Sequence, residues 1–367
     1  MMNGQRTRGL AIQRAALLRS DVFMIFGASE VALDMPFHAR DVFRTAPTGF
    51  TVLAVGEPGT PEAMTTQNLL ALGDALRGHH VAVFLSLEQF IRVPLHLPPK
   101  RPGAVRAVRA RFSPLHAATA LFGDEGDGLM RQRVATQFEE LAGLLDNEPL
   151  LRLAAHSLVR NTIADRVRYA LLRPIGRLMI ASLEIQDHIN VLDELVRSGG
   201  LPPRATRVRA PVDWAHLKRA GEVIARREAA GNPFGFTRRW FAEAILPELE
   251  SQRGSRPDSV SLGQLSRSGS WKELDLLIGA ITAVGAKALI ICGPLKGPYA
   301  DFRGTSPDAR RIVYDSVEHF AQVRGVPLLT FRAADEDPWF MGDQSHPSAK
   351  GWVGYDEALD AFYAGRR

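Results

Sequence analysis

Short runs of apolar residues recur along this chain and alternate with segments of helical periodicity. Five runs are rich in the β-branched and aromatic residues typical of buried strands: residues 22–26, 50–55, 81–85, 288–292 and 326–331. Buried strands that alternate with helices indicate βαβ units and a parallel sheet. We therefore expect an α/β fold, a three-layer α/β/α sandwich around a five-stranded, mainly parallel sheet.

The predicted helices of the sandwich flank these runs. Apolar residues at helical spacing predict an amphipathic helix within residues 1–20 and further helices at residues 62–76, 273–284, 308–323 and 349–362. The segments 35–43 and 293–299 carry no clear period, and we expect them to be loops.

Between the third and fourth predicted strands the pattern changes. Residues 91–110 are rich in proline and arginine and are expected to be a connection. Helical spacing then dominates, with predicted helices at residues 131–145, 150–171, 178–196 and 217–229. Residues 251–270 are rich in serine, glycine and arginine, which predicts a mobile loop. We expect a single α/β domain over residues 1–367, with a mainly helical insertion at about 95–270.

Composition limits the classes of function. Of 367 residues, 46% are apolar and the net charge is +5, so a large core is possible and the surface is mildly basic. Such a surface suits an anionic envelope polymer or phospholipid headgroups. No RNA-binding signature or zinc-finger spacing is present, so nucleic acid is not an expected partner. The single cysteine, Cys292, lies in an apolar run and is expected to be buried.

No apolar stretch in the sequence reaches 18 residues, and the first twenty residues lack the apolar core of a signal peptide. We therefore expect no membrane span and no signal peptide within this sequence. Any membrane anchor of the natural protein would lie outside it.

The first strand delivers a serine to a turn of small residues, Gly27-Ala28-Ser29. Such a turn places the hydroxyl at the carboxyl edge of the sheet, where open α/β sheets carry their active sites. The alternative is an ordinary strand-to-helix turn in which Ser29 caps the helix.

A second candidate lies between the fifth strand and the last helix, where Asp343 precedes His346 by three residues. The carboxylate can accept the Nδ1–H of the imidazole from the same turn, which leaves Nε2 to take a serine proton. The alternative is a surface turn with a capping histidine. Because loops after parallel strands share one sheet edge, Ser29 and His346 are predicted to meet there.

An acyl-transfer site also needs donors for the developing oxyanion. The candidates are the backbone N–H of Ser29 and one from the turn after the second strand, at Gly56 or Gly59. Glycine would allow the backbone to approach a substrate oxygen closely. The alternative is that these glycines only form a tight turn.

The motif Gly27-Ala28-Ser29-Glu30, together with Asp343-x-x-His346 and the following Gly351-Trp352, resembles the SGNH or GDSL superfamily of serine hydrolases. Within it the chain is similar to the DltD family of D-alanyl transfer proteins, whose first motif is Gly-Ser-Ser-Glu. The family's third block is similar to Ser86-Leu87-Glu88-Gln89-Phe90, and its Pro-x-Asn-x-x-Tyr loop to residues 294–299, with Lys296 in place of the asparagine.

The resemblance implies an SGNH-like domain. It also implies that the protein acts at the extracytoplasmic face of the cytoplasmic membrane. It implies Ser29 as nucleophile, His346 as general base and Asp343 as the carboxylate that orients it. The implied partners are a membrane-bound O-acyltransferase, a carrier or other donor of D-alanyl groups, and an anionic envelope polymer or glycan as acceptor. The arginine- and alanine-rich composition leaves the identity of that polymer open.

Three further residues are candidate substrate contacts. Glu30 follows the nucleophile and would suit an ammonium group, or it is a carboxylate favoured in the first turn of a helix. Tyr299 and Trp352 would line the cleft, or they pack in the core. No metal-ligand spacing is present, and we expect neither a metal nor a cofactor.

Three functions remain open from the sequence. The first is serine-dependent D-alanyl transfer or ester and thioester cleavage through an acyl-serine. The second is a carbohydrate O-acetyl esterase or O-acetyltransferase. The third is a non-catalytic adaptor for the membrane-bound O-acyltransferase.

Overall fold

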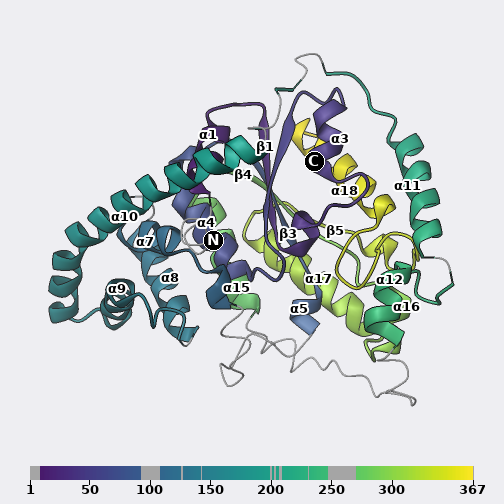
Figure 1. Ribbon diagram of the computed structural model, residues 1–367. Helices are drawn as coiled ribbons and strands as arrows, with labels where there is room; N and C mark the ends of the chain where they lie inside the picture. Colours follow the sequence, from purple (N-terminus) through teal and green to yellow (C-terminus); the bar gives the residue numbers. More distant parts are fainter. Residues whose placement is uncertain are drawn as a thin grey trace.

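The computed structural model describes most of the chain. The described residues are 9–91, 108–124, 127–141, 143–198, 201, 204–205, 209–229, 231–246 and 270–366. A central sheet lies between two helical layers, with a group of further helices to one side (Figure 1).

The sheet has five strands in the order β2-β1-β3-β4-β5, and every neighbouring pair is parallel. The strands are β1 (Val22–Gly27), β2 (Thr51–Gly56), β3 (His80–Leu85), β4 (Lys287–Cys292) and β5 (Leu328–Thr330). The α/β class, the strand number and the parallel pairing expected from the sequence are confirmed.

Each central strand is buried on both faces. In β1, Met24 and Phe26 enter one apolar core, whereas Phe23 and Ile25 enter the other. This alternation follows from the two-residue period of a strand and explains why the sequence shows a continuous apolar run. Cys292, at the end of β4, is fully buried.

Helices cover both faces of the sheet. On the first face lie α1 (Leu10–Leu17), α4 (Glu62–Leu72), α15 (Ser270–Val284) and α17 (Pro307–Val323). On the second lie α2 (Ser29–Ala32), α3 (Ala39–Thr45) and α18 (Ala349–Tyr363). Shorter helices are η2 (Gly73–Leu76), α5 (Glu88–Ile91), α16 (Gly297–Phe302) and η4 (Arg332–Ala334). The three-layer arrangement agrees with the expected sandwich.

The described residues between β3 and β4 contain helices, turns and coil but no strand. The helices not yet named are α7 (Pro114–Phe122), α8 (Gly128–Glu140), α9 (Pro149–Arg160), α10 (Ile163–Ser198), α11 (Trp214–Glu228), α12 (Arg238–Trp240) and η3 (Phe241–Ile245). The helices α7 to α10 extend from the α4 side, and α11 packs on α18 at the opposite side (Figure 1). That residues 1–367 form one domain stays a prediction.

One helix boundary in this region was predicted wrongly. The sequence predicted one helix over residues 150–171 and another over residues 178–196. The structure instead breaks at Asn161, which adopts φ 51° after α9, and α10 then runs through Pro174. Pro174 faces solvent, where water can satisfy the carbonyl that lacks its N–H partner.

Two predicted loops also contain helices. Residues 39–45 form α3, whose first turn is capped by the His38 side chain, which accepts a bond from the Arg40 N–H. Residues 297–302 form α16, with a proline in its first turn. Both helices are too short to show a clear apolar period. The predicted loop at 251–270 lies outside the described residues except for Ser270, which begins α15.

Among the described residues, no helix combines the length and the apolar character that a bilayer span requires.

Candidate active site

The strand order defines one position in the fold where a site is favoured. From β1 the chain crosses to β2 at one side and then returns to β3 at the other. A crevice opens at the carboxyl ends of strands where such a reversal occurs, here between β1 and β3. Ser29 follows the last residue of β1 by two positions and is the first residue of α2.

The imidazole of His346 joins Ser29 to Asp343. Its Nε2 lies 2.7 Å from the Ser29 Oγ, and its Nδ1 lies 2.6 Å from the Asp343 Oδ2. Ser29 and His346 come from opposite ends of the chain, 317 positions apart. Their order is the one that a hydroxyl–imidazole–carboxylate relay requires.

The local turn fixes the orientation of the Asp343 carboxylate. Its Oδ1 accepts the backbone N–H groups of Ser345 at 2.7 Å and of His346 at 2.8 Å. The other oxygen is thereby directed at the imidazole. A carboxylate so placed selects the tautomer with hydrogen on Nδ1, which leaves the Nε2 lone pair for the serine proton.

Two opposing effects act on His346. Burial by itself lowers the pKa of the imidazole, whereas the hydrogen bond and negative charge of Asp343 raise it, with smaller contributions from Glu30 and Glu88. The net effect raises the pKa of His346 above 6.5. His346 is therefore a stronger base than a free histidine.

A small cavity of about 20 Å³ opens beside the relay, room for about one water molecule. It lies at the ends of β3 and β4, and its lining includes Ser345 and Gln344 of the histidine loop. Among the described residues, the ionisable side chains in its lining are those of Glu30, Glu88 and Tyr355, and no lysine or arginine takes part. Burial raises the pKa of Glu30, whose Oε1 accepts the Ala28 N–H at 2.8 Å. The cavity beside the relay is therefore lined by two acidic side chains, one of which accepts a backbone N–H of the Ser29 turn.

The two glycines expected near the oxyanion have different surroundings. Gly56 pairs with Gly27 in the sheet, and a Cβ added to Gly56 would lie 2.8 Å from the Ala28 carbonyl oxygen. The backbone of β2 thus approaches the Ser29 turn closely. Gly59 has φ +71° and lies against the guanidinium of Arg111. Of the two, Gly56 is the one that contacts the Ser29 turn.

Lys296 holds the loop that carries Asp343 and His346. Its buried Nζ donates to the carbonyl oxygens of Met341 at 2.6 Å, Pro338 at 3.1 Å and Gly235 at 3.4 Å. Burial lowers the pKa of Lys296 to about 7, although nearby aspartates oppose that shift. From the sequence, Lys296 was noted only because it departs from a family motif. Its three hydrogen bonds to carbonyls distant in sequence could not be predicted from the residues around it.

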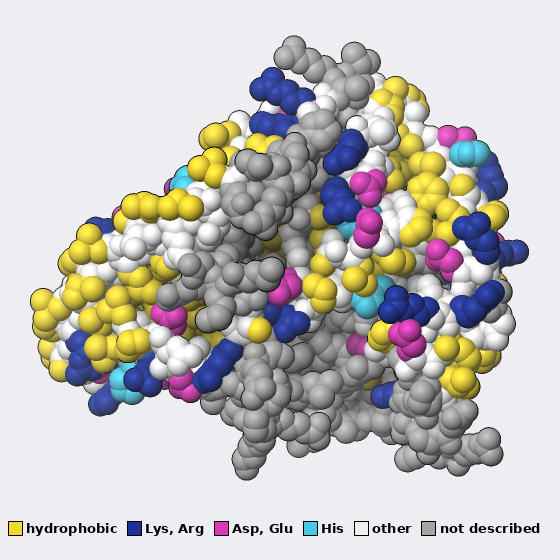
Figure 2. Space-filling view, in the orientation of Figure 1, with side chains coloured by type: hydrophobic (Ala, Val, Ile, Leu, Met, Phe, Trp, Pro, Cys, Tyr) yellow, Lys and Arg dark blue, Asp and Glu magenta, His cyan; other side chains and the backbone are white. Residues whose placement is uncertain are grey.

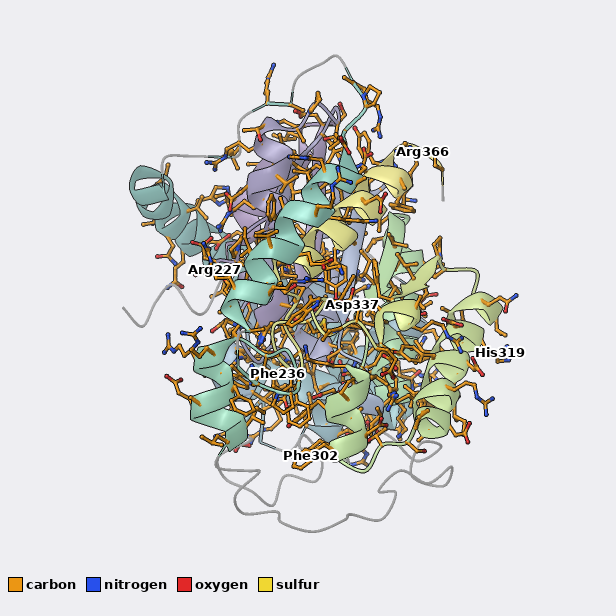
Figure 3. The ribbon with its side chains drawn as sticks, turned by 90° about the vertical axis from the view of Figure 1, so that its right-hand side faces the viewer. Arg227, Phe236, Phe302, His319, Asp337 and Arg366 are labelled. Atoms are coloured by element: carbon orange, nitrogen blue, oxygen red, sulfur yellow. The ribbon has the colours of Figure 1, made fainter. Side chains whose placement is uncertain are left out.

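An aromatic cluster from the helical insertion covers one side of the site. Phe234 and Phe236 contact Tyr299, whose hydroxyl donates to the Gln344 Oε1 at 3.3 Å. Phe236 lies between Asp337 and Phe302 on the side of the molecule shown in Figure 3. Tyr299 is thus buried in this cluster and contacts the histidine loop.

Sequence reasoning missed Trp240. Its ring meets that of His346 edge to face, with centroids 6.5 Å apart, and its Nε1 is buried without a hydrogen-bond partner among the described residues. The sequence does show a run of aromatic residues at 234–241. It could not show that this run contacts His346, which lies more than a hundred residues away.

Trp352 lies in the core. It is fully buried and packs on His38, with ring centroids 4.2 Å apart. The His38 Nδ1 accepts the Arg40 N–H, so its Nε2 carries the hydrogen and donates to the Val31 carbonyl at 3.0 Å. Burial lowers the pKa of His38. Of the two alternatives for Trp352, these contacts favour packing in the core. Trp352 reaches α2 only through His38, which donates to Val31.

Comparisons with known proteins agree over nearly the whole chain. A family model described as DltD protein matches residues 1–364. Protein DltD of Bacillus subtilis (strain 168) is 22% identical over 364 residues, 99% of this chain and 87% of that protein. Protein DltD of Staphylococcus aureus (strain NCTC 8325 / PS 47) is 20% identical over 361 residues, 98% of this chain and 85% of that protein.

Proposed function

The chain belongs to the DltD family, and on this premise we propose that it is a serine acyl-transfer protein of the SGNH type that acts in D-alanylation of a cell-envelope polymer. The observation that carries the proposal is the Ser29–His346–Asp343 contact, at 2.7 and 2.6 Å. The proposed location is the extracytoplasmic face of the cytoplasmic membrane.

The first half of the reaction forms an acyl-serine. His346 Nε2 takes the proton of the Ser29 hydroxyl as Oγ attacks the carbonyl carbon of a D-alanyl ester or thioester. The oxyanion that forms faces the N–H of Ser29, at the first turn of α2, and the backbone of the turn after β2 at Gly56. The carbonyl re-forms, and the alcohol or thiol departs with the proton from His346.

The second half transfers the acyl group. His346 takes a proton from an acceptor hydroxyl, which attacks the acyl-serine, and Ser29 recovers its proton from His346 as it leaves. Water in place of the acceptor would give hydrolysis. The proposed partners are a membrane-bound O-acyltransferase, a D-alanyl donor or carrier, and an anionic polymer or glycan as acceptor.

The acidic cavity supports a charged acyl group over an acetyl group. A D-alanyl group carries an ammonium near its carbonyl, and Glu30 and Glu88 line the cavity beside the nucleophile. An acetyl group carries no ammonium to interact with these side chains. In this proposal Tyr299 stabilises the histidine loop from the aromatic cluster, and Trp352 stabilises the site from the core.

The test is covalent labelling of Ser29. We expect a serine-directed phosphonate to add one adduct, mapped to Ser29 by mass spectrometry, and the adduct to be lost in Ser29→Ala and His346→Ala. Ser182→Ala, at an exposed serine on α10, is the matched control and should label as the unmodified protein does. An adduct on another serine, or full labelling of His346→Ala, would contradict the proposed nucleophile.

A substrate panel separates the remaining functions. D-Alanyl esters should be cleaved faster than their N-acetyl-D-alanyl and acetyl counterparts, because only the first carry the ammonium. Preference for acetyl esters would instead indicate an O-acetyl esterase. If Ser29→Ala preserved D-alanylation in cells, the protein would be an adaptor and the proposed chemistry would be wrong.

A further inference from the structure

The longest helix of the molecule, α10, leaves one apolar face open to solvent. The side chains on this face are 53–83% exposed, although all are aliphatic. We call this the α10 face, and it consists of Ile163, Val167, Leu171, Ile175, Leu178, Ile185, Ile189 and Leu192. In Figure 2 apolar side chains gather along the left of the molecule, where Figure 1 shows α10.

The spacing of these residues makes the face continuous. Successive members are three, four or seven positions apart, so they follow one side of a helix. The other residues on that arc between 163 and 192 are Ala164, Pro174, Ala181 and Ser182, so it holds no ionisable side chain. From its first to its last residue the face is about 44 Å long.

The opposite side of α10 is firmly held. Asp187 is buried and accepts the N–H groups of Gly9 at 3.1 Å and Ala11 at 2.6 Å, while Arg14 pairs with Glu184 at 2.6 Å. At Gly176 an added Cβ would lie 2.2 Å from the Phe122 ring. The helix is thus fixed on α1 and α7, and the α10 face is directed outward by that packing.

Arginines accompany the face along its first half. Residues 160–178 contain five arginines and one aspartate, and that aspartate, Asp165, is buried. Arg166 and Arg177 are exposed and lie beside the apolar arc on one flank, with Arg168 on the other. Arg177 pairs with Asp124 and Arg168 with Asp165, whereas Arg166, among the described residues, donates only to the neutral side chain of Asn161. Five arginines thus face two carboxylates, which leaves a positive excess along this part of the helix. Guanidinium groups in this position can reach phosphate groups while their stems lie along an apolar layer.

We infer that the α10 face lies in the plane of an anionic phospholipid surface, with its aliphatic side chains among the acyl chains and its arginines at the phosphates. A long helix with one apolar face and cationic flanks has the form of an interfacial helix. A second copy is disfavoured, because two such faces in contact would bring their arginine-rich flanks close together without added anions. The inference does not rest on the proposed reaction.

The test is flotation of the full chain with lipid vesicles. We expect binding to vesicles of phosphatidylglycerol and phosphatidylcholine, much weaker binding to phosphatidylcholine alone, and weakening by added salt. The double variant Leu171→Asp/Leu178→Asp should lower the partition coefficient at least about tenfold. Because both leucines are exposed, the variant should fold normally, which circular dichroism checks.

Matched variants identify the surface responsible. Val223→Asp/Val323→Asp changes two equally exposed aliphatic residues on α11 and α17 and should bind as the unmodified chain does. Ser29→Ala should also bind normally, so failure of the proposed chemistry would leave this result intact. Binding unchanged by Leu171→Asp/Leu178→Asp, or no binding to anionic vesicles, would overturn the inference. A dimer in solution that this variant dissociates would assign the face to a second copy instead.

Discussion

The imidazole of His346 shows how neighbours outweigh burial at the scale of one residue. Enclosure disfavours its cation, but the carboxylates of Asp343, Glu30 and Glu88 favour it more, and the pKa lies above 6.5. A general base must be neutral to accept a proton, so the reaction requires a pH above that pKa. Activity should therefore rise with pH through a midpoint above 6.5.

Replacing the orienting carboxylate should move that midpoint. In Asp343→Asn the largest effects that raise the pKa of His346 are lost, while burial and the smaller effects of Glu30 and Glu88 remain, so the acid limb of kcat/KM should shift to lower pH. The plateau should fall about 10³- to 10⁴-fold, because an amide can select the wrong tautomer. The measurement is a pH–rate profile for ester hydrolysis; an acid limb at its original pH would show that Asp343 does not act on the imidazole.

The sequence was sufficient to pair Ser29 with His346, because parallel strands place their following loops on one edge. It was not sufficient to find Lys296 or Trp240 as neighbours of that pair. Lys296 reaches carbonyls 42 to 61 residues away in sequence, and Trp240 approaches from the helical insertion. Contacts of this kind depend on tertiary packing, which leaves no local periodicity.

At the scale of elements, the position of the histidine loop depends on α18, which begins three residues after His346. Ser348 caps this helix by accepting the N–H groups of Lys350 at 3.1 Å and Gly351 at 3.2 Å. The Lys350 ammonium pairs with Glu222 of α11 and with Asp337, each at 2.7 Å. The helix α11 therefore supports the start of α18 and, through it, the loop.

The contact between these helices requires a glycine. A Cβ added to Gly221 of α11 would lie 2.8 Å from the Ala349 carbonyl oxygen and 3.0 Å from the Lys350 Cα, both backbone atoms. Gly221→Ala should force the helices apart and lower the free energy of unfolding by about 1–3 kcal/mol, despite the better helix propensity of alanine.

Thermal unfolding and ester hydrolysis measure this effect together. Val223→Ala, on the exposed side of the same helix, should leave both near the values of the unmodified protein. If Gly221→Ala were as stable as the unmodified protein, α11 would not be packed tightly on α18.

Element type was predictable where a segment is long and strongly patterned. The strands β1 to β4 show continuous apolar runs because helices cover both faces of the sheet. The short helices α3 and α16 were not predictable, since one or two turns cannot show a period and their ends depend on caps. The bounds of α9 and α10 were wrong because Asn161 ends α9 in a left-handed conformation and α10 continues through the exposed Pro174.

At the scale of the whole molecule, one buried acid should affect stability across the pH range. Asp356 of α18 is fully buried, and neither carboxylate oxygen has a hydrogen-bond partner among the described residues. Burial raises the pKa of Asp356 well above 3.8. The folded state therefore holds a proton that the unfolded chain releases, and this residue's contribution to stability is largest below pH 3.8 and falls as pH rises toward the folded pKa.

Asp356→Asn should remove that dependence. The free energy of unfolding of the variant, relative to the unmodified protein, should increase by about 1.4 kcal/mol for each pH unit between roughly 5 and the folded pKa. The measurement is denaturant unfolding of Asp356→Asn and of the unmodified protein at pH 5, 6, 7 and 8. The contributions of the other titrating groups cancel in the difference between the two proteins. Parallel stability curves for the two proteins would mean that Asp356 is ionised in the folded state.

The enclosed position of Cys292 has a practical consequence. The chain has one cysteine, and burial raises the pKa of its thiol, so it should resist alkylating reagents while the protein is folded. A thiol introduced at an exposed site would then be the single reactive one. Spin labels or fluorophores could be attached at chosen positions of the native chain without first engineering a cysteine-free background.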